Sequence, residues 1–164
     1  MALMVSVASG LFVLESLIPN PVPWFRLGLA NIITLLAITW WGVREALIIL
    51  VLRVVLGSLL AGRFLHPIFV LSLSGGVTAT LVMGLCSRFR DKIFSMMGIS
   101  ICGALSKNLT QLIVAYLIYI RQISILHLLP LFLSGSLLAG VLIGYIAFLI
   151  DMRIKIHDFQ YLDR

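Results

Sequence analysis

Residues 125–150 read ILHLLPLFLSGSLLAGVLIGYIAFLI, an apolar run that contains no Asp, Glu, Lys or Arg. A helix needs about 20 mostly apolar residues to cross the hydrocarbon core of a bilayer. This run is longer than that, and its apolar residues are continuous, whereas a transmembrane strand would alternate. The stretch therefore predicts a membrane-spanning helix, and with it an integral membrane protein.

The composition of the whole chain supports this prediction. Of its 164 residues, 62% are hydrophobic and 11% are charged. A typical soluble domain has about 45–50% apolar and about 25% charged residues. These values exclude a soluble enzyme domain, a secreted disulfide scaffold and a disordered protein.

Five further apolar runs precede residues 125–150. The expected spans cover residues 2–18, 27–41, 45–60, 64–86, 93–120 and 125–150. We therefore expect an all-α integral membrane protein in which residues 1–164 form a single domain of six transmembrane helices. An even number of spans places both termini on the same side of the membrane.

The basic residues predict the orientation of this bundle. Ten of the twelve Lys and Arg residues lie at span borders or in the C-terminal tail, and they contribute most of the net charge of +6. Seven lie on the side of the termini and three on the other, so the positive-inside rule places both termini in the cytoplasm. No nucleic-acid partner is expected. The larger set is Arg44, Arg88, Arg90, Lys92, Arg153, Lys155 and Arg164; the smaller set is Arg26, Arg63 and Arg121.

A few polar side chains fall inside the expected spans. Such groups are costly in a membrane, so they usually face an interior, pair with one another or serve a function. At a rise of about 1.5 Å per residue, four different spans place them in the outer half of the membrane. This convergence predicts a pocket that opens to the outside. The residues are Glu15, Asn31, Arg53, Lys107, Asn108 and Gln111.

The same residues could instead pair internally. Glu15 could neutralise Arg53 or Lys107, and the amides could join helices by hydrogen bonds. Two cations and one acid nevertheless leave one positive charge over. A cation in a medium of low dielectric constant attracts an anionic ligand group such as carboxylate or phosphate.

Two groups of small residues add to these expectations. Gly75 and Gly76 could admit a ligand close to the backbone, although helix packing is the commoner use of such glycines. Ala2, Ser6 and Gly10 recur every four residues and form a flat stripe that lets another helix approach closely. The spacing leaves open whether that helix belongs to this chain or to another subunit.

The connection at residues 19–26, PNPVPWFR, contains three prolines in five residues. Proline restricts its own backbone and that of the preceding residue, so this connection is extended and not helical. Either it is a plain connector, or it helps to cover a site beneath it, and Arg26 then contributes to that site.

No catalytic or metal-binding motif is present in the sequence. No Gly-Lys pair occurs, which excludes a Walker A phosphate loop. The acids are not clustered as magnesium-dependent diphosphate chemistry requires. The histidines lack ligand spacing, so neither a metal nor another cofactor is expected. Cys86 and Cys102 are expected at different depths of successive helices, which disfavours a disulfide.

Four segments carry a family resemblance. PWFRLGLANIITLLA (23–37), RVVLGSLLAG (53–62), SLSGG (72–76) and GALSKNLTQL (103–112) resemble the small bacterial membrane proteins called heptaprenyl diphosphate synthase component I, or the Gx transporter family. The resemblance spans nearly the whole chain. The chain lacks the aspartate-rich motifs of true prenyl diphosphate synthases, so the resemblance does not imply catalysis.

More generally, the chain is similar to the substrate-binding S components of energy-coupling-factor transporters. That resemblance implies a six-helix bundle that binds a vitamin-like solute from outside, under the loop between the first two helices. It also implies docking on a shared transmembrane subunit and two ATPases through small residues of the first helix. Ser6 departs from the alanine that is usual in that pattern.

The leading hypothesis is therefore a non-enzymatic, S-component-like subunit in a bacterial cell membrane. It would take up a small anionic, vitamin-like or isoprenoid-like solute with the help of ATPases on other chains. The alternative is an accessory or anchor subunit for isoprenoid, quinone or flavin-linked electron-transfer metabolism. The expected docking residues are Ala2, Ser6 and Gly10, and the expected solute-binding residues are Arg26, Asn31, Arg53, Gly75, Gly76, Lys107, Asn108 and Gln111.

Overall fold

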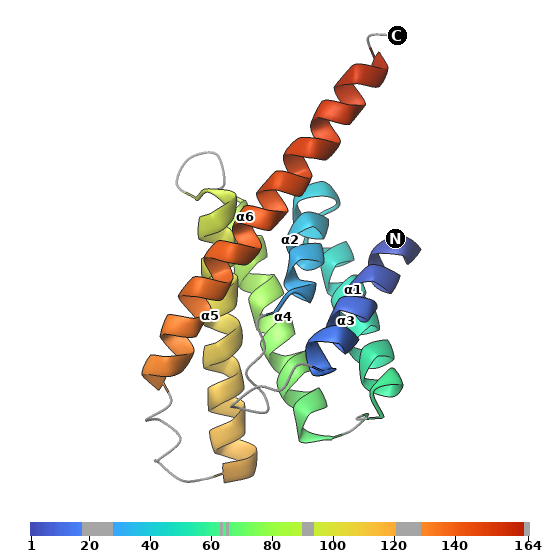
Figure 1. Ribbon diagram of the computed structural model, residues 1–164. Coiled ribbons are helices and arrows are strands. Elements are labelled where there is room, and N and C mark those ends of the chain that lie inside the picture. Colours follow the sequence, from blue (N-terminus) through green and yellow to red (C-terminus); the bar gives the residue numbers. More distant parts are fainter. Residues whose placement is uncertain (18–27, 63, 65, 90–93, 121–128, 163–164) are drawn as a thin grey trace.

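The computed structural model describes residues 1–17, 28–62, 64, 66–89, 94–120 and 129–162, and within these ranges all of its regular secondary structure is helical. This confirms the all-α class. The helices are α1 (Ala2–Leu17), α2 (Ala30–Trp40), α3 (Val43–Leu60), α4 (Pro67–Ser87), α5 (Met96–Val114), the π-helical turn η1 (Ala115–Ile120) that continues α5, and α6 (Leu129–Leu162). Figure 1 shows them as one bundle, with α6 crossing it obliquely.

Three helices are long and apolar enough to cross a membrane. They cover Pro67–Ser87, Met96–Ile118 and Leu129–Ile154, and they indicate a membrane protein. The apolar helices Ala2–Glu15 and Ala30–Trp40 are shorter, and α3 carries Arg44, Glu45 and Arg53 within 18 residues. The six-span arrangement therefore remains a prediction.

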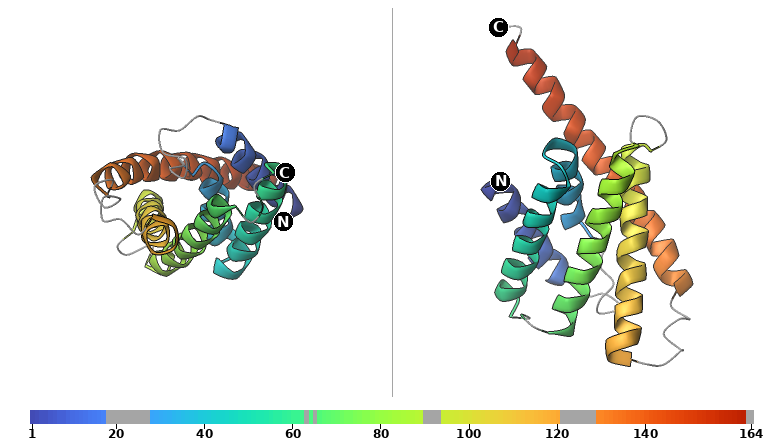
Figure 2. Two further views of the ribbon diagram at one scale, coloured as in Figure 1. Left: turned by 90° about the horizontal axis from the view of Figure 1, so that it is seen from below. Right: turned by 180° about the vertical axis from the view of Figure 1, so that it is seen from behind.

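The shortest of the α-helices, α2, lies in the middle of the bundle. Its 11 residues span about 16 Å at 1.5 Å per residue, which is half of the roughly 30 Å hydrocarbon core. Residues 30–38 are all buried, and α2 contacts α1, α3, α4 and α6. The structure thus makes part of the expected second span a helix that is surrounded by protein (Figure 2).

Glycines allow α4, α5 and α6 to pack closely. A Cβ atom added at Gly140 or Gly144 would lie 2.7 Å from the Cα atom of Ile101 or Met97, respectively. A Cβ atom added at Gly103 would lie 2.5 Å from Met83 Cγ. No other side chain fits at these places without a shift, so the glycines set the distance of α5 from α4 and α6.

The beginning of α1 and the end of α6 lie toward the same end of the bundle (Figures 1 and 2). The last helix continues to Leu162, well past the expected boundary at residue 150. Near this end, Trp40 Nε1 donates a hydrogen bond of 2.8 Å to Asp151 Oδ1 and so ties α2 to α6. The side chain of Trp41 is exposed.

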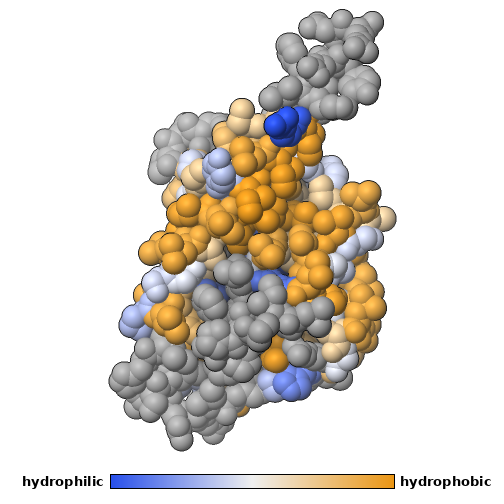
Figure 3. All heavy atoms as spheres, in the orientation of Figure 1, coloured by the Kyte–Doolittle hydropathy of each residue, from blue (hydrophilic) through white to orange (hydrophobic). Residues whose placement is uncertain are grey.

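Large apolar side chains cover much of the outer surface. The face formed by α1 and α6 is mainly hydrophobic (Figure 3). Leu3 of α1 and Leu138 of α6 are 75% and 76% exposed. Such a surface is stable against lipid tails but not in water.

The two cysteines lie closer together than the sequence predicted. Cys86 is in the last turn of α4, and Cys102 is in the second turn of α5. Both are free thiols. The Cys102 side chain acts electrostatically on the Cys86 thiol, so the two side chains lie near each other despite the expected difference in depth.

Candidate functional site

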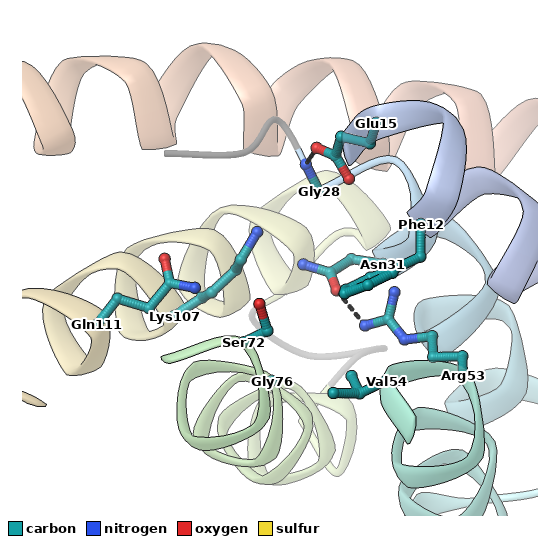
Figure 4. A pocket seen from close by; sticks show the side chains of 10 residues that line it. All are labelled: Phe12, Glu15, Gly28, Asn31, Arg53, Val54, Ser72, Gly76, Lys107 and Gln111. Carbon is teal, nitrogen blue, oxygen red and sulfur yellow. Dashed lines mark hydrogen bonds between the residues drawn. The ribbon is translucent and has the colours of Figure 1, made fainter. Parts of the chain in front are cut away.

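A polar cavity lies among five helices, at the end of α1, the start of α2, the middle of α3, the first half of α4 and the second half of α5. Figure 4 shows Lys107 and Arg53 reaching into it from opposite sides, with Asn31 between them. The cavity is lined by Phe12, Glu15, Gly28, Asn31, Arg53, Val54, Ser72, Gly76, Lys107 and Gln111.

Glu15 and Gly28 join the last turn of α1 to the residues that precede α2. The backbone N–H of Gly28 donates a hydrogen bond to Glu15 Oε1, and Glu15 is buried. Gly28 has a φ of +84°, a conformation that glycine adopts without steric cost. Its Cα also has crowded surroundings: an added Cβ would lie 3.0 Å from Asn31 Nδ2 and 3.1 Å from Lys107 Nζ.

Arg53 is the buried cation of α3. Its Nη2 donates a hydrogen bond of 2.7 Å to Asn31 Oδ1, and the carboxylate of Glu15 acts on it electrostatically. Its Nε is buried without a hydrogen-bond partner. The guanidinium is therefore oriented by α1 and α2, but its hydrogen-bonding capacity is not used up.

Lys107 and Gln111 are four residues apart on α5, so they lie on the same helix face. Both are buried and both line the cavity. Gln111 Nε2 donates a hydrogen bond of 3.2 Å to the carbonyl oxygen of Leu71 on α4, whereas its Oε1 is buried without a partner. Buried polar atoms without partners are uncommon in proteins, and two of them, Gln111 Oε1 and Arg53 Nε, belong to residues that line this cavity.

Gly75, Gly76 and Asn108 have different surroundings. Gly76 lines the cavity. Gly75 instead packs on α5, where an added Cβ would lie 2.8 Å from Gln111 Cγ. Asn108 faces α6: its Nδ2 donates a hydrogen bond of 2.6 Å to Ser136 Oγ. Neither Gly75 nor Asn108 is a lining residue.

Five of the eight expected solute-binding residues thus line one cavity: Asn31, Arg53, Gly76, Lys107 and Gln111. Arg26 lies outside the described residues. Glu15, which the sequence places among the polar residues of the outer half, also lines the cavity, although it is not among the expected solute-binding residues. Ser72, Phe12, Gly28 and Val54 line it as well. The sequence gives no signal for the last three, which are apolar residues or glycine within apolar surroundings.

The cavity is small in this conformation. Its volume is about 20 Å³, and one water molecule needs about 10–15 Å³ by the same measure. A larger solute fits only when lining side chains or helices separate.

The small-residue stripe of α1 faces away from the bundle. Ala2, Ser6 and Gly10 are all exposed, and an added Cβ at Gly10 would have no heavy atom within 4 Å. The Ser6 hydroxyl donates a hydrogen bond of 3.1 Å to the carbonyl oxygen of Ala2, so its hydrogen is used within its own helix. The described helices of this chain therefore leave the stripe uncovered.

The fold and the cavity define an all-helical membrane protein with two buried cations beside a polar cavity. Over residues 4–150 the sequence matches the family described as heptaprenyl diphosphate synthase component I, and the chain belongs to this family. No curated protein and no solved structure matches the chain. Within the described ranges, no group of three or more His, Cys, Asp and Glu residues is placed to hold a metal ion.

Proposed function

We propose that this chain is a non-enzymatic membrane subunit that binds a small anionic solute in the cavity. The observation that carries the proposal is the pair of buried cations, Arg53 and Lys107. Among the described residues that line the cavity, they are accompanied by one acid, Glu15. The excess positive charge favours a carboxylate or phosphate group on the solute, because the attraction is strong where water is excluded.

The amides of the cavity would orient the solute. Gln111 Oε1 is a buried acceptor without a partner, and it can receive a hydrogen bond from a hydroxyl or amide of the solute. Asn31 holds Arg53 in place. Phe12 and Val54 supply apolar contacts, as do most lining residues of small-molecule sites.

The proposed site faces the outside of the cell. The cavity is lined by Phe12 and Glu15 in the second half of α1, away from the end of the bundle toward which the beginning of α1 and the end of α6 lie (Figure 1). With six spans and both termini in the cytoplasm, this is the outer half of a bacterial cell membrane. Uptake would then need energy from partner ATPases, and the exposed stripe of Ala2, Ser6 and Gly10 is the proposed docking face for the transmembrane coupling subunit.

Thermal unfolding of the purified protein in detergent tests the binding proposal. A panel of anionic vitamins, flavin nucleotides and isoprenoid diphosphates is compared with neutral analogues of similar size. A true ligand raises the unfolding temperature as its concentration increases beyond its Kd, and the neutral analogue does not. Equal responses to both members of every pair would contradict the proposed role of the cations.

A second candidate function is favoured by the description of the family. Its name points to a subunit that accompanies an enzyme of isoprenoid diphosphate synthesis, and this chain would then anchor or assist that enzyme. Purification from native membranes followed by mass spectrometry separates the two candidates. ATPase modules among the retained proteins support the transport subunit, whereas prenyl-transferring or redox enzymes support the accessory subunit.

A further inference from the structure

The net charge of the cavity limits the charge of the anion that it can hold. Arg53 and Lys107 line the cavity together with Glu15, and all three side chains are buried. Among the described lining residues, two cations and one acid leave one positive charge. Because an uncompensated charge is costly in a medium of low dielectric constant, the best ligand is one that cancels this charge and adds no further charge.

The three charged residues of the cavity lie around one glycine. The backbone N–H of Gly28 donates a hydrogen bond to Glu15, and an added Cβ at Gly28 would lie 3.1 Å from Lys107 Nζ and 3.0 Å from Asn31 Nδ2. Asn31 in turn accepts the hydrogen bond of Arg53. Figure 4 shows Glu15 and Lys107 approaching Gly28 from different sides. The charges therefore act on the same small space, and their sum sets the preferred charge of a ligand.

The other acids with described side chains lie elsewhere. Glu45 is in the first turn of α3, and at about 1.5 Å per residue it is about 12 Å from Arg53 along the helix. Asp151 of α6 accepts a hydrogen bond from Trp40 at the end of α2. Neither acid lines the cavity. Within the part of the chain that the structure describes, Glu15 is thus the carboxylate that offsets the two cations.

The size of the cavity favours the same kind of ligand as its charge. The volume of about 20 Å³ holds little more than one water molecule, which needs about 10–15 Å³. A carboxylate is smaller than a phosphate, and a phosphate is smaller than a diphosphate. A carboxylate therefore requires the least separation of the surrounding helices.

We propose that the cavity selects a solute whose buried end is a carboxylate with a single negative charge, in preference to a phosphate or a diphosphate. This inference rests on the proposed anion-binding function and narrows its substrate class. A carboxylate leaves the filled cavity without net charge. A phosphate monoester carries close to two negative charges above its second pKa of about 6, and a diphosphate carries more, so either leaves a buried negative charge. An isoprenoid diphosphate therefore binds more weakly than the matching carboxylate.

Matched probes test this selectivity on the purified full chain in detergent, at about pH 8, above the second pKa of a phosphate ester. One series is built on a benzyl group and another on a geranyl group, and each contains the carboxylate, its neutral amide, the phosphate and the diphosphate. The Kd of each probe follows from the rise of the unfolding temperature with its concentration. We expect the carboxylate of at least one series to bind at least about tenfold more tightly than the other members of that series.

Variants that change the net charge of the cavity should change the selectivity. In Glu15→Gln the amide oxygen can still accept the hydrogen bond from Gly28, while the cavity gains one positive charge. We expect the ratio of the phosphate Kd to the carboxylate Kd to fall at least about tenfold. The matched control, Glu45→Gln, removes the same charge outside the cavity and should leave the ratio unchanged. Lys107→Met removes a cation instead and should abolish the preference for the carboxylate over the amide, which provides the test if Glu15→Gln does not fold.

The contrary results distinguish this inference from the proposed function. If no probe stabilises the parent chain, or if the amides bind as tightly as the anions, the anion-binding function fails and the inference fails with it. If a phosphate or diphosphate binds as tightly as the matching carboxylate, anion binding stands and the preference for a single charge is overturned. Equal changes of the Kd ratio in Glu15→Gln and Glu45→Gln would also overturn it, because the effect would then not arise in the cavity.

Discussion

Arg53 shows how a single residue can carry a charge inside an apolar bundle. Its guanidinium is buried, hydrogen bonded to Asn31 and within the field of Glu15. Removing one partner of a buried charged hydrogen bond leaves the other without compensation, which costs more than the bond itself contributes. Asn31 should therefore matter for stability as well as for the site.

We expect Asn31→Ala to lower the free energy of unfolding by about 1.5–3 kcal/mol, since the guanidinium of Arg53 loses an acceptor. A matched control lies one turn along α2. The hydroxyl of Thr34 is buried without a partner, so Thr34→Val should leave stability unchanged or raise it. Denaturant unfolding in detergent measures both. Equal losses in the two variants would show that helix packing, and not the polar contact, accounts for the effect.

Alanine substitutions at three glycines distinguish the energetic cost of backbone strain from that of steric crowding. Gly28→Ala combines a φ of +84° with crowded neighbours, and we expect it to cost more than the roughly 1–2 kcal/mol of a left-handed backbone alone. Gly62 has a φ of +63° with open space around it, so Gly62→Ala should lower the free energy of unfolding only by that amount. Gly10 lies in a helix with open space around it, so Gly10→Ala should raise the free energy of unfolding by about 0.5–1 kcal/mol. Unfolding temperatures in a different order would contradict the geometry described at Gly28.

The scarcity of charge within apolar runs made part of the site predictable. Arg53, Lys107 and Asn31 stand out in the sequence because a membrane does not tolerate them without a reason. The sequence could not distinguish Gln111 from Asn108, which are three residues apart on α5. Their side chains point about 60° apart around the helix axis, and the position of α6 decides that Asn108 meets Ser136.

At the scale of elements, α2 departs most from its prediction. The apolar run at residues 27–41 has the composition of a span. Composition alone does not show that Gly28 precedes the helix with a φ of +84° or that the helix ends at Trp40. Because α2 is enclosed by four other helices, its contacts at both ends fix its position. The Trp40–Asp151 hydrogen bond is one of these contacts.

We expect Trp40→Phe to lower the unfolding temperature, because the buried carboxylate of Asp151 loses a donor, at a cost of about 1–3 kcal/mol. The neighbouring variant Trp41→Phe is the control, since Trp41 is 44% exposed. Both variants remove one tryptophan and both alter the same edge-to-face ring pair. The account of how α2 is anchored fails if Trp41→Phe is as destabilising as Trp40→Phe.

At the scale of the whole molecule, the composition was enough to predict helices in a membrane, because it leaves too little polar surface for water. The orientation rests on the distribution of basic residues and is open to a direct test. We expect a cysteine at Phe64, between α3 and α4, to react with a membrane-impermeant maleimide from outside intact cells. A cysteine at Arg88, between α4 and α5, should react only after lysis.

Both positions are exposed in the structure, and the labelling uses a chain in which Cys86 and Cys102 are serine. Labelling of the Arg88 position from outside, with the Phe64 position protected, would reverse the orientation and place the cavity in the inner half of the membrane.

The central claim is that the buried cations bind an anionic solute. It is tested most directly by the equilibrium Kd of the strongest anionic ligand for the parent chain, for Arg53→Met and for Arg153→Met. Arg153 is an exposed cation of α6 and controls for net charge. We predict that Arg53→Met raises the Kd at least tenfold, about 1.4 kcal/mol or more, because a buried charge contact with the ligand is lost, whereas Arg153→Met leaves it unchanged. Equal Kd values for all three proteins, each shown to be folded, would contradict the claim.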